Sequence, residues 1–308
     1  MKNEIDLSII VITLNTKDFL EKCLVSLRPA LKKIKAEVII IDNASTDGTL
    51  EMINKNHSYA KVYKRNKIYS FCENNNYGYK YAKGRYILFL NNDTELTADH
   101  ILQEMTAWMD SNPKVGLSTC MLLNSDRKTI QGTGGSFPTL FKVFLWMSFL
   151  DDIPGIDRLI KPFHPMHNLS FMGTNEDYYK KEHQQDWVTG AFYFVRKKAL
   201  EKAGVFDEDY SAYVDEVDLS FRINKAGWKT WYLPRWKVIH YGSGSYGSER
   251  SFISEMKNIK LFFAKHYPKW QIPLLNVIIK LGCLLRIIVF SFVKPSLVKI
   301  YAKAIKTV

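Results

Sequence analysis

Cysteine is scarce in this chain, and its four cysteines, Cys23, Cys72, Cys120 and Cys283, lie far apart with no CxxC pair. This spacing argues against a disulfide framework or a cysteine zinc site, so we interpret them as reduced thiols in a core. The start of the chain also lacks a signal peptide, because acidic residues precede an apolar run that is only as long as a strand. Both absences predict a cytoplasmic protein.

Two signatures of nucleotide and nucleic-acid chemistry are missing as well. A nucleotidyltransferase usually carries a glycine-rich, basic phosphate loop near its N-terminus, and Asn15-Thr16-Lys17 is not such a loop. The net charge of +12 calls for an anionic partner, such as a nucleotide, an anionic lipid or a nucleic acid. No RNA-binding signature accompanies that charge, so we expect no nucleic-acid partner.

Apolar runs of strand length alternate with stretches of helical spacing in the first part of the chain. The runs at 7–14, 37–42 and 86–90 are almost continuously apolar, as in strands buried on both faces of a parallel sheet. Residues 18–31 and 98–111 show helical spacing instead. The alternation predicts an α/β fold, with a mostly parallel central sheet flanked by helices.

The remaining pattern is less regular. Further strands are predicted at 61–63, 115–123, 187–195, 229–233 and 237–241, and further helices up to about 55 and at 74–82, 197–203, 214–226 and 249–266. Residues 137–185 begin with an apolar, aromatic stretch and then lose any clear period. We expect that region to shape the site that accepts the second substrate.

Polar residues follow three predicted strands at the edge of the sheet where ligands bind in open α/β folds. Thr13 and Asn15 follow the first strand, Asp42 ends the second, and Asn91-Asn92-Asp93 follows the strand at 86–90. A carboxylate among amides suits a hard divalent cation that already carries a diphosphate. A plain Asn/Asp turn after a core strand would give the same pattern.

Farther along the chain lie Asp215-Glu216-Val217-Asp218 and His240. Together with the strand-end residues, they resemble the inverting nucleotide-sugar glycosyltransferases of family 2, which have the Rossmann-like GT-A fold. Within that family, the rhamnosyltransferase-like enzymes of bacterial polysaccharide assembly are the nearest subgroup. The resemblance implies a GT-A domain at 1–248, with a nucleotide-sugar half to about 125 and an acceptor half after it, followed by a helical segment at 249–308.

The resemblance also implies a donor site. Asp42 matches the acid that holds the base or ribose of the nucleotide, with a residue that merely caps a turn as the alternative. The stretch from Phe71 to Gly78 resembles a family motif written F-x-x-G-N-N-x-G, with Asn74 where glycine is usual. The residues expected to line the nucleotide-sugar site are Thr13, Asn15, Asp42, Asn43, Asn75, Asn76, Asn91 and Asn92.

A metal site is implied beside it. Asn91-Asn92-Asp93 stands where the family has D-x-D, so that Asp93 is the anionic ligand there. His240 matches a downstream histidine that completes the metal or diphosphate site in relatives, although a lone histidine after a short strand is often structural. The cofactor implied is a divalent cation, Mg²⁺ or Mn²⁺.

The acidic cluster matches the family's E-D-x-D with its first two acids transposed. By position Glu216 is the catalytic base, and the transposition leaves Asp215 as the second candidate. Crowded carboxylates are expected to raise one another's pKa, whereas simple acids at a helix start would be favoured by the helix dipole. Trp187, Gly190 and Asp218 are expected at the acceptor site, with Trp187 either stacked on a sugar or filling the core.

The implied activity is metal-dependent transfer of a hexose, with inversion, from a nucleotide-sugar donor to a hydroxyl of a glycan or lipid-linked acceptor. The donor would be dTDP-rhamnose or a UDP-sugar. A nucleotidyltransferase and a non-catalytic nucleotide-sugar-binding protein stay open as alternatives. Release of a nucleoside diphosphate, rather than pyrophosphate, separates the first of these from the glycosyltransferase.

The tail is unlike the rest of the chain. Residues 274–293 are almost wholly apolar but include Lys280 and Arg286, and lysines follow to the end. Two cations near the middle are costly in a membrane-spanning helix, so we expect an interfacial helix on anionic lipid and a peripheral position on the inner face of the cytoplasmic membrane. A helix packed on the rest of the protein is the alternative. Removal of the tail before Gln271 is expected to leave a soluble protein.

Overall fold

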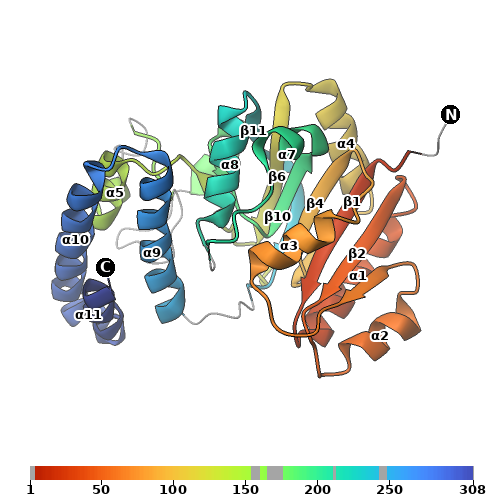
Figure 1. Ribbon diagram of the computed structural model, residues 1–308, viewed down its shortest axis with the longest axis horizontal. Helices are drawn as coiled ribbons and strands as arrows, with labels where there is room; N and C mark the ends of the chain where they lie inside the picture. Colours follow the sequence, from red (N-terminus) through yellow and green to blue (C-terminus); the bar gives the residue numbers. More distant parts are fainter. Residues whose placement is uncertain (1–3, 154–159, 165–175, 211–212, 243–247, 308) are drawn as a thin grey trace.

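The computed structural model describes residues 4–153, 160–164, 176–210, 213–242 and 248–307. Its centre is a mixed sheet in the order β3-β2-β1-β4-β10-β6-β11-β5, with β8 beside β11 (Figure 1). The strands are β1 (Leu7–Thr13), β2 (Ala36–Asp42), β3 (Lys61–Lys64), β4 (Tyr86–Asn91), β5 (Thr94–Leu96), β6 (Val115–Leu123), β8 (His183–Gln185), β10 (Phe192–Arg196) and β11 (Lys229–His240). A small second sheet pairs β7 (Gly134–Gly135) with β9 (Trp187–Val188).

The helices of the described part pack around this sheet or gather beyond one end of it. Those around the sheet are α1 (Lys17–Ala30), α2 (Thr49–Asn56), α3 (Phe71–Tyr79), α4 (Ile101–Ser111), α7 (Lys197–Ala203) and α8 (Asp215–Lys225). Those beyond it are α5 (Leu140–Met147), α9 (Ser248–His266), α10 (Gln271–Val293) and α11 (Val298–Thr307). The predicted α/β fold with a C-terminal helical segment is therefore confirmed.

The first four strands run parallel, and their register fixes the place of the candidate site. Thr13 lies opposite Asp42 in the β1–β2 pair, and Ile12 lies opposite Asn91 in the β1–β4 pair. The carboxyl ends of the three strands therefore meet at one edge of the sheet. β10 then runs antiparallel to β4, so the sheet is mixed rather than parallel throughout.

Both faces of this sheet are covered, which explains the continuous apolar runs. Ile9 and Val11 of β1 face a core that includes Leu24 of α1, whereas Ile10 faces a core that includes Cys72 of α3. The other cysteines are buried free thiols as well, as the sequence predicted. Successive side chains of a strand point to opposite faces, so a strand covered on both sides has no polar alternation.

Three predicted boundaries were wrong for local reasons. The two strands expected at 229–233 and 237–241 are one strand, β11, whose register shifts between Leu233 and Lys237. The strand expected at 187–195 is interrupted, so that β9 and β10 belong to different sheets. Helix α3 begins at Phe71 rather than at Asn74, because Ser70 and Glu73 form a reciprocal capping box at its start.

The helical group at the left of Figure 1 combines the C-terminal segment with α5 from the middle of the chain. Helix α10 lies so close to α5 that a methyl group on Gly282 would come within 2.5 Å of Met147 Cβ. Arg286 of α10 is buried and donates to the carbonyl oxygens of Trp146 and Met147 at the end of α5. Helix α10 is thus packed on the rest of the protein, and its removal would uncover the apolar side of α5, which argues against a soluble truncated chain.

Candidate active site

Hydrogen bonds tie the polar ends of β1 and β4 together. Asn92 Nδ2 donates to the carbonyl oxygen of Ile12 and to Thr16 Oγ1, each at 2.8 Å. Thr16 Oγ1 in turn lies 3.0 Å from Thr13 Oγ1. Thr13 and Asn92 therefore stand at the predicted edge, but their polar groups also hold that edge in shape.

The loop after β2 folds over the same edge. Asn15 has a positive φ of 51°, and its Oδ1 accepts from the backbone N–H of Thr46 at 2.7 Å. Asp42 is 2% exposed, and its Oδ1 accepts from the backbone N–H of Ser45 at 3.3 Å. Asn15 therefore positions this loop, and Asp42 contributes a buried carboxylate where the loop begins.

The asparagines predicted to face the donor differ in what they contact. Asn43 and the backbone of Tyr69 exchange two hydrogen bonds, at 3.0 and 2.9 Å, which join the end of β2 to the start of α3. Asn76 Nδ2 donates to the Phe206 carbonyl oxygen at 2.9 Å and to Glu208 Oε1 at 2.8 Å. Asn75 is buried, and within the described residues its Nδ2 has no hydrogen-bond partner. Asn75 is therefore the member of this set that still has donors for a ligand.

Asp93 and His240, predicted from distant parts of the sequence, lie together. Asp93 Oδ1 is 3.2 Å from His240 Nε2, and Asn91 Nδ2 is 3.3 Å from the same ring nitrogen. The pairing arises because β5, directly after Asp93, is antiparallel to β11, so that His240 lies opposite Thr94. In the described part of the chain, no group of three or more His, Cys, Asp or Glu side chains could hold a metal.

Gln131, which the sequence analysis missed, fixes the tautomer of His240. The amide Nε2 of Gln131 faces two oxygens, the His240 carbonyl at 2.6 Å and Asn124 Oδ1 at 2.8 Å, and must donate to them. Its Oε1 therefore faces His240 Nδ1, at 2.8 Å, and accepts the ring proton there. In the neutral imidazole, His240 Nε2 then carries the lone pair, which faces Asp93 Oδ1 and Asn91 Nδ2. Two electron-pair donors at this separation fit a cation shared between them.

The acidic cluster begins α8 after a turn with positive φ at Tyr213 and Val214 (65° and 69°), a costly conformation for such residues. Asp215 is 3% exposed, lies within hydrogen-bonding reach of the Cys72 thiol, and burial raises its carboxyl pKa. Glu216 is partly exposed. Desolvation, followed by repulsion from Asp215, raises the pKa of Glu216 well above its usual range.

A chain of contacts connects these acids with the strand-end site. The backbone N–H of Asn91 donates to the Ala191 carbonyl oxygen at 3.0 Å. A methyl group on Gly190, next to Ala191, would lie in ordinary van der Waals contact with the Phe71 ring, at 3.4 Å. Phe71 precedes Cys72, whose thiol interacts with Asp215 at the start of α8. The start of α3 therefore lies between Gly190 and the acidic cluster.

Two residues expected at the acceptor site are buried and engaged in contacts within the protein. Asp218 is fully buried, and its carboxylate contacts Arg222 Nε at 2.8 Å and His266 Nε2 at 2.6 Å. Although burial opposes its charge, those two partners hold the pKa of Asp218 below its usual value. Trp187 is buried in the core, where its indole Nε1 donates to the Ser136 carbonyl oxygen at 3.1 Å. Both side chains are therefore structural, and the core alternative for Trp187 was correct.

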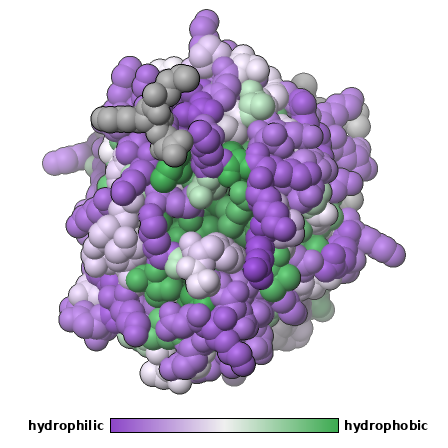
Figure 2. Space-filling view, turned by 90° about the vertical axis from the view of Figure 1, so that its right-hand side faces the viewer, coloured by the Kyte–Doolittle hydropathy of each residue, from purple (hydrophilic) through white to green (hydrophobic). Residues whose placement is uncertain are grey.

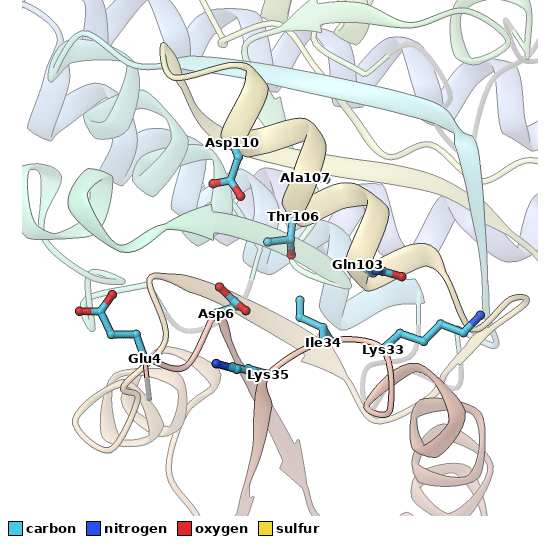
Figure 3. A pocket seen from close by; sticks show the side chains of 9 residues that line it. All are labelled: Glu4, Asp6, Lys33, Ile34, Lys35, Gln103, Thr106, Ala107 and Asp110. Carbon is cyan, nitrogen blue, oxygen red and sulfur yellow. The ribbon is translucent and has the colours of Figure 1, made fainter. Parts of the chain in front are cut away.

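A pocket of about 720 Å³ lies at the opposite edge of the sheet, before β1 begins (Figure 3). Its lining side chains come from the start of the chain, the connection between α1 and β2, and α4: Glu4, Asp6, Lys33, Ile34, Lys35, Gln103, Thr106, Ala107 and Asp110. None of them is a predicted site residue. Because ligands of open α/β sheets bind at the carboxyl ends of strands, this pocket is not the candidate site.

Comparison with known proteins gives the family of the chain. Residues 8–202 match the family model described as glycosyl transferase family 2. The chain is 24% identical over 293 residues to an N-acetylglucosaminyl-diphospho-decaprenol L-rhamnosyltransferase of Mycobacterium tuberculosis, covering 87% of each chain. It is 26% identical over 255 residues to the rhamnosyltransferase WbbL of Escherichia coli, covering 80% of this chain and 86% of that protein.

Solved structures show the same fold. A mannosyltransferase of Pyrobaculum calidifontis, in complex with GDP-Man and Mn²⁺, superimposes with a TM-score of 0.59 at 15% identity, over 99% of this chain and 86% of that one. Residues 1–349 of Staphylococcus aureus TarS, in complex with UDP-GlcNAc, give a TM-score of 0.55 at 15% identity, over 97% and 79% of the two chains. At these identities the likeness concerns the fold alone.

Proposed function

The chain belongs to glycosyl transferase family 2, and from this membership we propose that it transfers a hexose from a nucleoside-diphosphate sugar to an acceptor hydroxyl, inverting the anomeric carbon. The relatives named as rhamnosyltransferases support dTDP-rhamnose as the donor, with a UDP-sugar as the other choice. The Mycobacterium relative is named for a decaprenol-linked substrate, which supports a lipid-linked saccharide as the acceptor. The observation that carries the proposal is the meeting of Asp42, Asp93 and His240 at one sheet edge.

Asp42 would hold the nucleoside, since a buried carboxylate at a strand end accepts well from an imide N–H or a ribose hydroxyl. Asn75 would donate its unpartnered amide hydrogens to the donor sugar or diphosphate. Thr13, Asn15, Asn43, Asn76 and Asn92 would act mainly by holding the three loops of this pocket in place.

Asp93 and His240 would bind one divalent cation, with diphosphate oxygens and water as its remaining ligands. The cation would offset the charge that builds up on the departing nucleoside diphosphate. A ligand set with one carboxylate oxygen and one imidazole nitrogen suits Mn²⁺ better than Mg²⁺, which prefers oxygen alone. Gln131 would hold the His240 ring with Nε2 directed at that site.

Glu216 would act as the base, removing the proton of the acceptor hydroxyl as that oxygen attacks the anomeric carbon from the face opposite the leaving group. Its partial exposure supports this assignment over Asp215, which lies buried beside Cys72. The raised pKa of Glu216 makes it a stronger base than an ordinary carboxylate. Asp215 would raise the basicity of Glu216 by its charge and orient it.

The proposed place of action is the cytoplasmic face of a membrane, where a lipid-linked acceptor is available. The test of the proposed function is incubation of the protein with Mn²⁺ and candidate donors, with separation of the products. Release of a nucleoside diphosphate with a glycosylated acceptor supports the proposal. Pyrophosphate release would favour a nucleotidyltransferase, and donor binding without turnover under all conditions would leave a binding protein.

A further inference from the structure

One side of α10 exposes apolar residues along its whole length. They recur every three or four residues, which places them within one stripe of the helix. We call this stripe the apolar face; it consists of Trp270, Leu274, Val277, Leu281, Leu284, Leu285, Ile288 and Phe292. Leu281 is 60% exposed, Ile288 61% and Phe292 86%. At 1.5 Å per residue, this face is roughly 35 Å long.

Helix α5, packed against α10, also exposes apolar side chains. Phe141 is 55% exposed and Phe144 is 43% exposed, although other residues of α5, such as Trp146, are buried. An exposed apolar stripe as long as that of α10 is rare on soluble monomers and marks a site of interaction.

The opposite side of α10 is packed within the protein. Leu275, Ile279 and Cys283 are buried against the helical group. The Arg286 guanidinium is 1% exposed and lies 4.3 Å from the centroid of the Phe149 ring. By length and composition α10 could cross a bilayer. To be surrounded by lipid, however, it would have to leave α5 and strip Arg286 of its carbonyl partners, which is costly.

The charges on the C-terminal helices α10 and α11 have one sign. No acidic residue follows Glu255 in the sequence, whereas lysines continue to its end. Lys269, Lys280 and Lys294 are exposed near the start, middle and end of α10. A second copy of the chain on this face would bring like charges together, whereas an anionic bilayer would attract them.

From these observations we infer that α10 and α5 insert the apolar face into the headgroup boundary of an anionic bilayer, with α10 parallel to the membrane plane. The lysines then contact the lipid phosphates, and Trp270 lies at the interface, where indoles are favoured. Figure 2 shows the side of the molecule turned away from these helices, where hydrophilic side chains surround an apolar patch. The catalytic domain thus stays in water beside the membrane.

The test is flotation of the full-length protein with vesicles of 70% phosphatidylcholine and 30% phosphatidylglycerol. Val277→Glu, at a residue 53% exposed on the apolar face, is matched by Val25→Glu, at a residue 55% exposed on α1. We expect the wild type and Val25→Glu to float with the vesicles. The double variant Val277→Glu, Leu281→Glu should have a membrane–water partition coefficient at least about tenfold lower than that of the wild type. We also expect vesicles to shift tryptophan emission to the blue in the wild type but much less in Trp270→Phe.

The inference rests on the proposed function only because a lipid-linked acceptor would be located at the membrane. Flotation measures membrane binding without any turnover, so it tests the inference separately. Unaltered circular dichroism of the variants excludes unfolding as the cause. Failure of the wild type to float at low salt would overturn the inference and leave the proposed transfer intact. Two other results would also overturn the inference. One is a wild type that does not float but sediments as a dimer, with Leu281→Glu dissociating that dimer. The other is membrane-bound protein that resists alkaline carbonate extraction, as a protein with a spanning helix does.

Discussion

Replacing Gln131 by leucine tests whether the orientation of the His240 ring is needed for metal binding. The substitution keeps the size of the side chain but removes the acceptor for His240 Nδ1–H and the two donor contacts of Gln131, at 2.6 and 2.8 Å. Loss of a partner that orients a histidine ligand typically lowers metal affinity 10–100-fold, which is about 1.4–2.8 kcal/mol. The three lost hydrogen bonds should lower the free energy of unfolding by about 1–3 kcal/mol.

The assay is titration with Mn²⁺ in the presence of a nucleoside diphosphate, followed by electron paramagnetic resonance of free Mn²⁺. Gln131→Glu separates the two effects, because a carboxylate still accepts from Nδ1–H but cannot donate to the His240 carbonyl. It should restore Mn²⁺ affinity while remaining less stable than the wild type. Gln184→Leu, at an exposed position on β8, is the control for a general effect of leucine. Folded Gln131→Leu with unchanged Mn²⁺ affinity would refute the argument.

Three further predictions concern the proposed roles of the acids. Asp93→Ala should abolish metal-stimulated transfer without unfolding the protein, and normal turnover of a folded variant would contradict its role. Asp42→Ala should weaken donor binding by about 1.5–3 kcal/mol in calorimetry, the usual value of a charged hydrogen bond; unchanged affinity would make Asp42 structural. Glu216→Gln should lower kcat by about 10²–10⁴-fold with little change in donor affinity, and Asp215→Asn should cost less; the reverse order would exchange their roles. Because the pKa of Glu216 is raised, kcat should rise with pH on the acid limb, and that limb should vanish in Glu216→Gln.

The same pKa shift has a consequence for stability. The folded state holds the proton of Glu216 more tightly than the unfolded state, so this carboxyl destabilises the fold as pH rises from its unfolded pKa through its folded one. Glu216→Gln should therefore raise the melting temperature at neutral pH, and the gain should disappear at acid pH. A lower melting temperature in the variant at neutral pH would show that the carboxylate is well stabilised.

Much of the fold could be predicted from the sequence because its signals are local. A strand covered on both sides is a continuous apolar run, so β1, β2 and β4 were found nearly to their ends. β11 was predicted as two strands because Pro234-Arg235-Trp236 interrupts the apolar pattern. Only its pairing with β6 shows that the strand continues past a register shift. Because Asp42 and the Asn91–Asp93 stretch both follow strands, the sequence also predicted that they lie at the same edge of the sheet.

The parts that failed depend on contacts between distant residues. Asp218 belongs to the same acidic stretch as Glu216, but rotation around α8 turns it toward His266 of α9, and no local pattern encodes that partner. Gln131 reaches His240 across the fold from a segment with no motif of its own. Trp187 carries a polar group and a large apolar surface, so its sequence position alone fits a sugar platform and a core equally well.

The packing of α5 against α10 also sets the order in which the protein can be completed during synthesis. α5 leaves the ribosome long before α10. Although Phe163 packs against Trp146, the buried residues Val143, Trp146 and Met147 are not fully covered until the C-terminal helices arrive. Arg286 can cap the end of α5 only then. The nascent chain therefore carries an incompletely covered apolar helix while residues 148–270 are made, the state that chaperones recognise. A membrane surface near the ribosome would shelter both helices at the moment they meet.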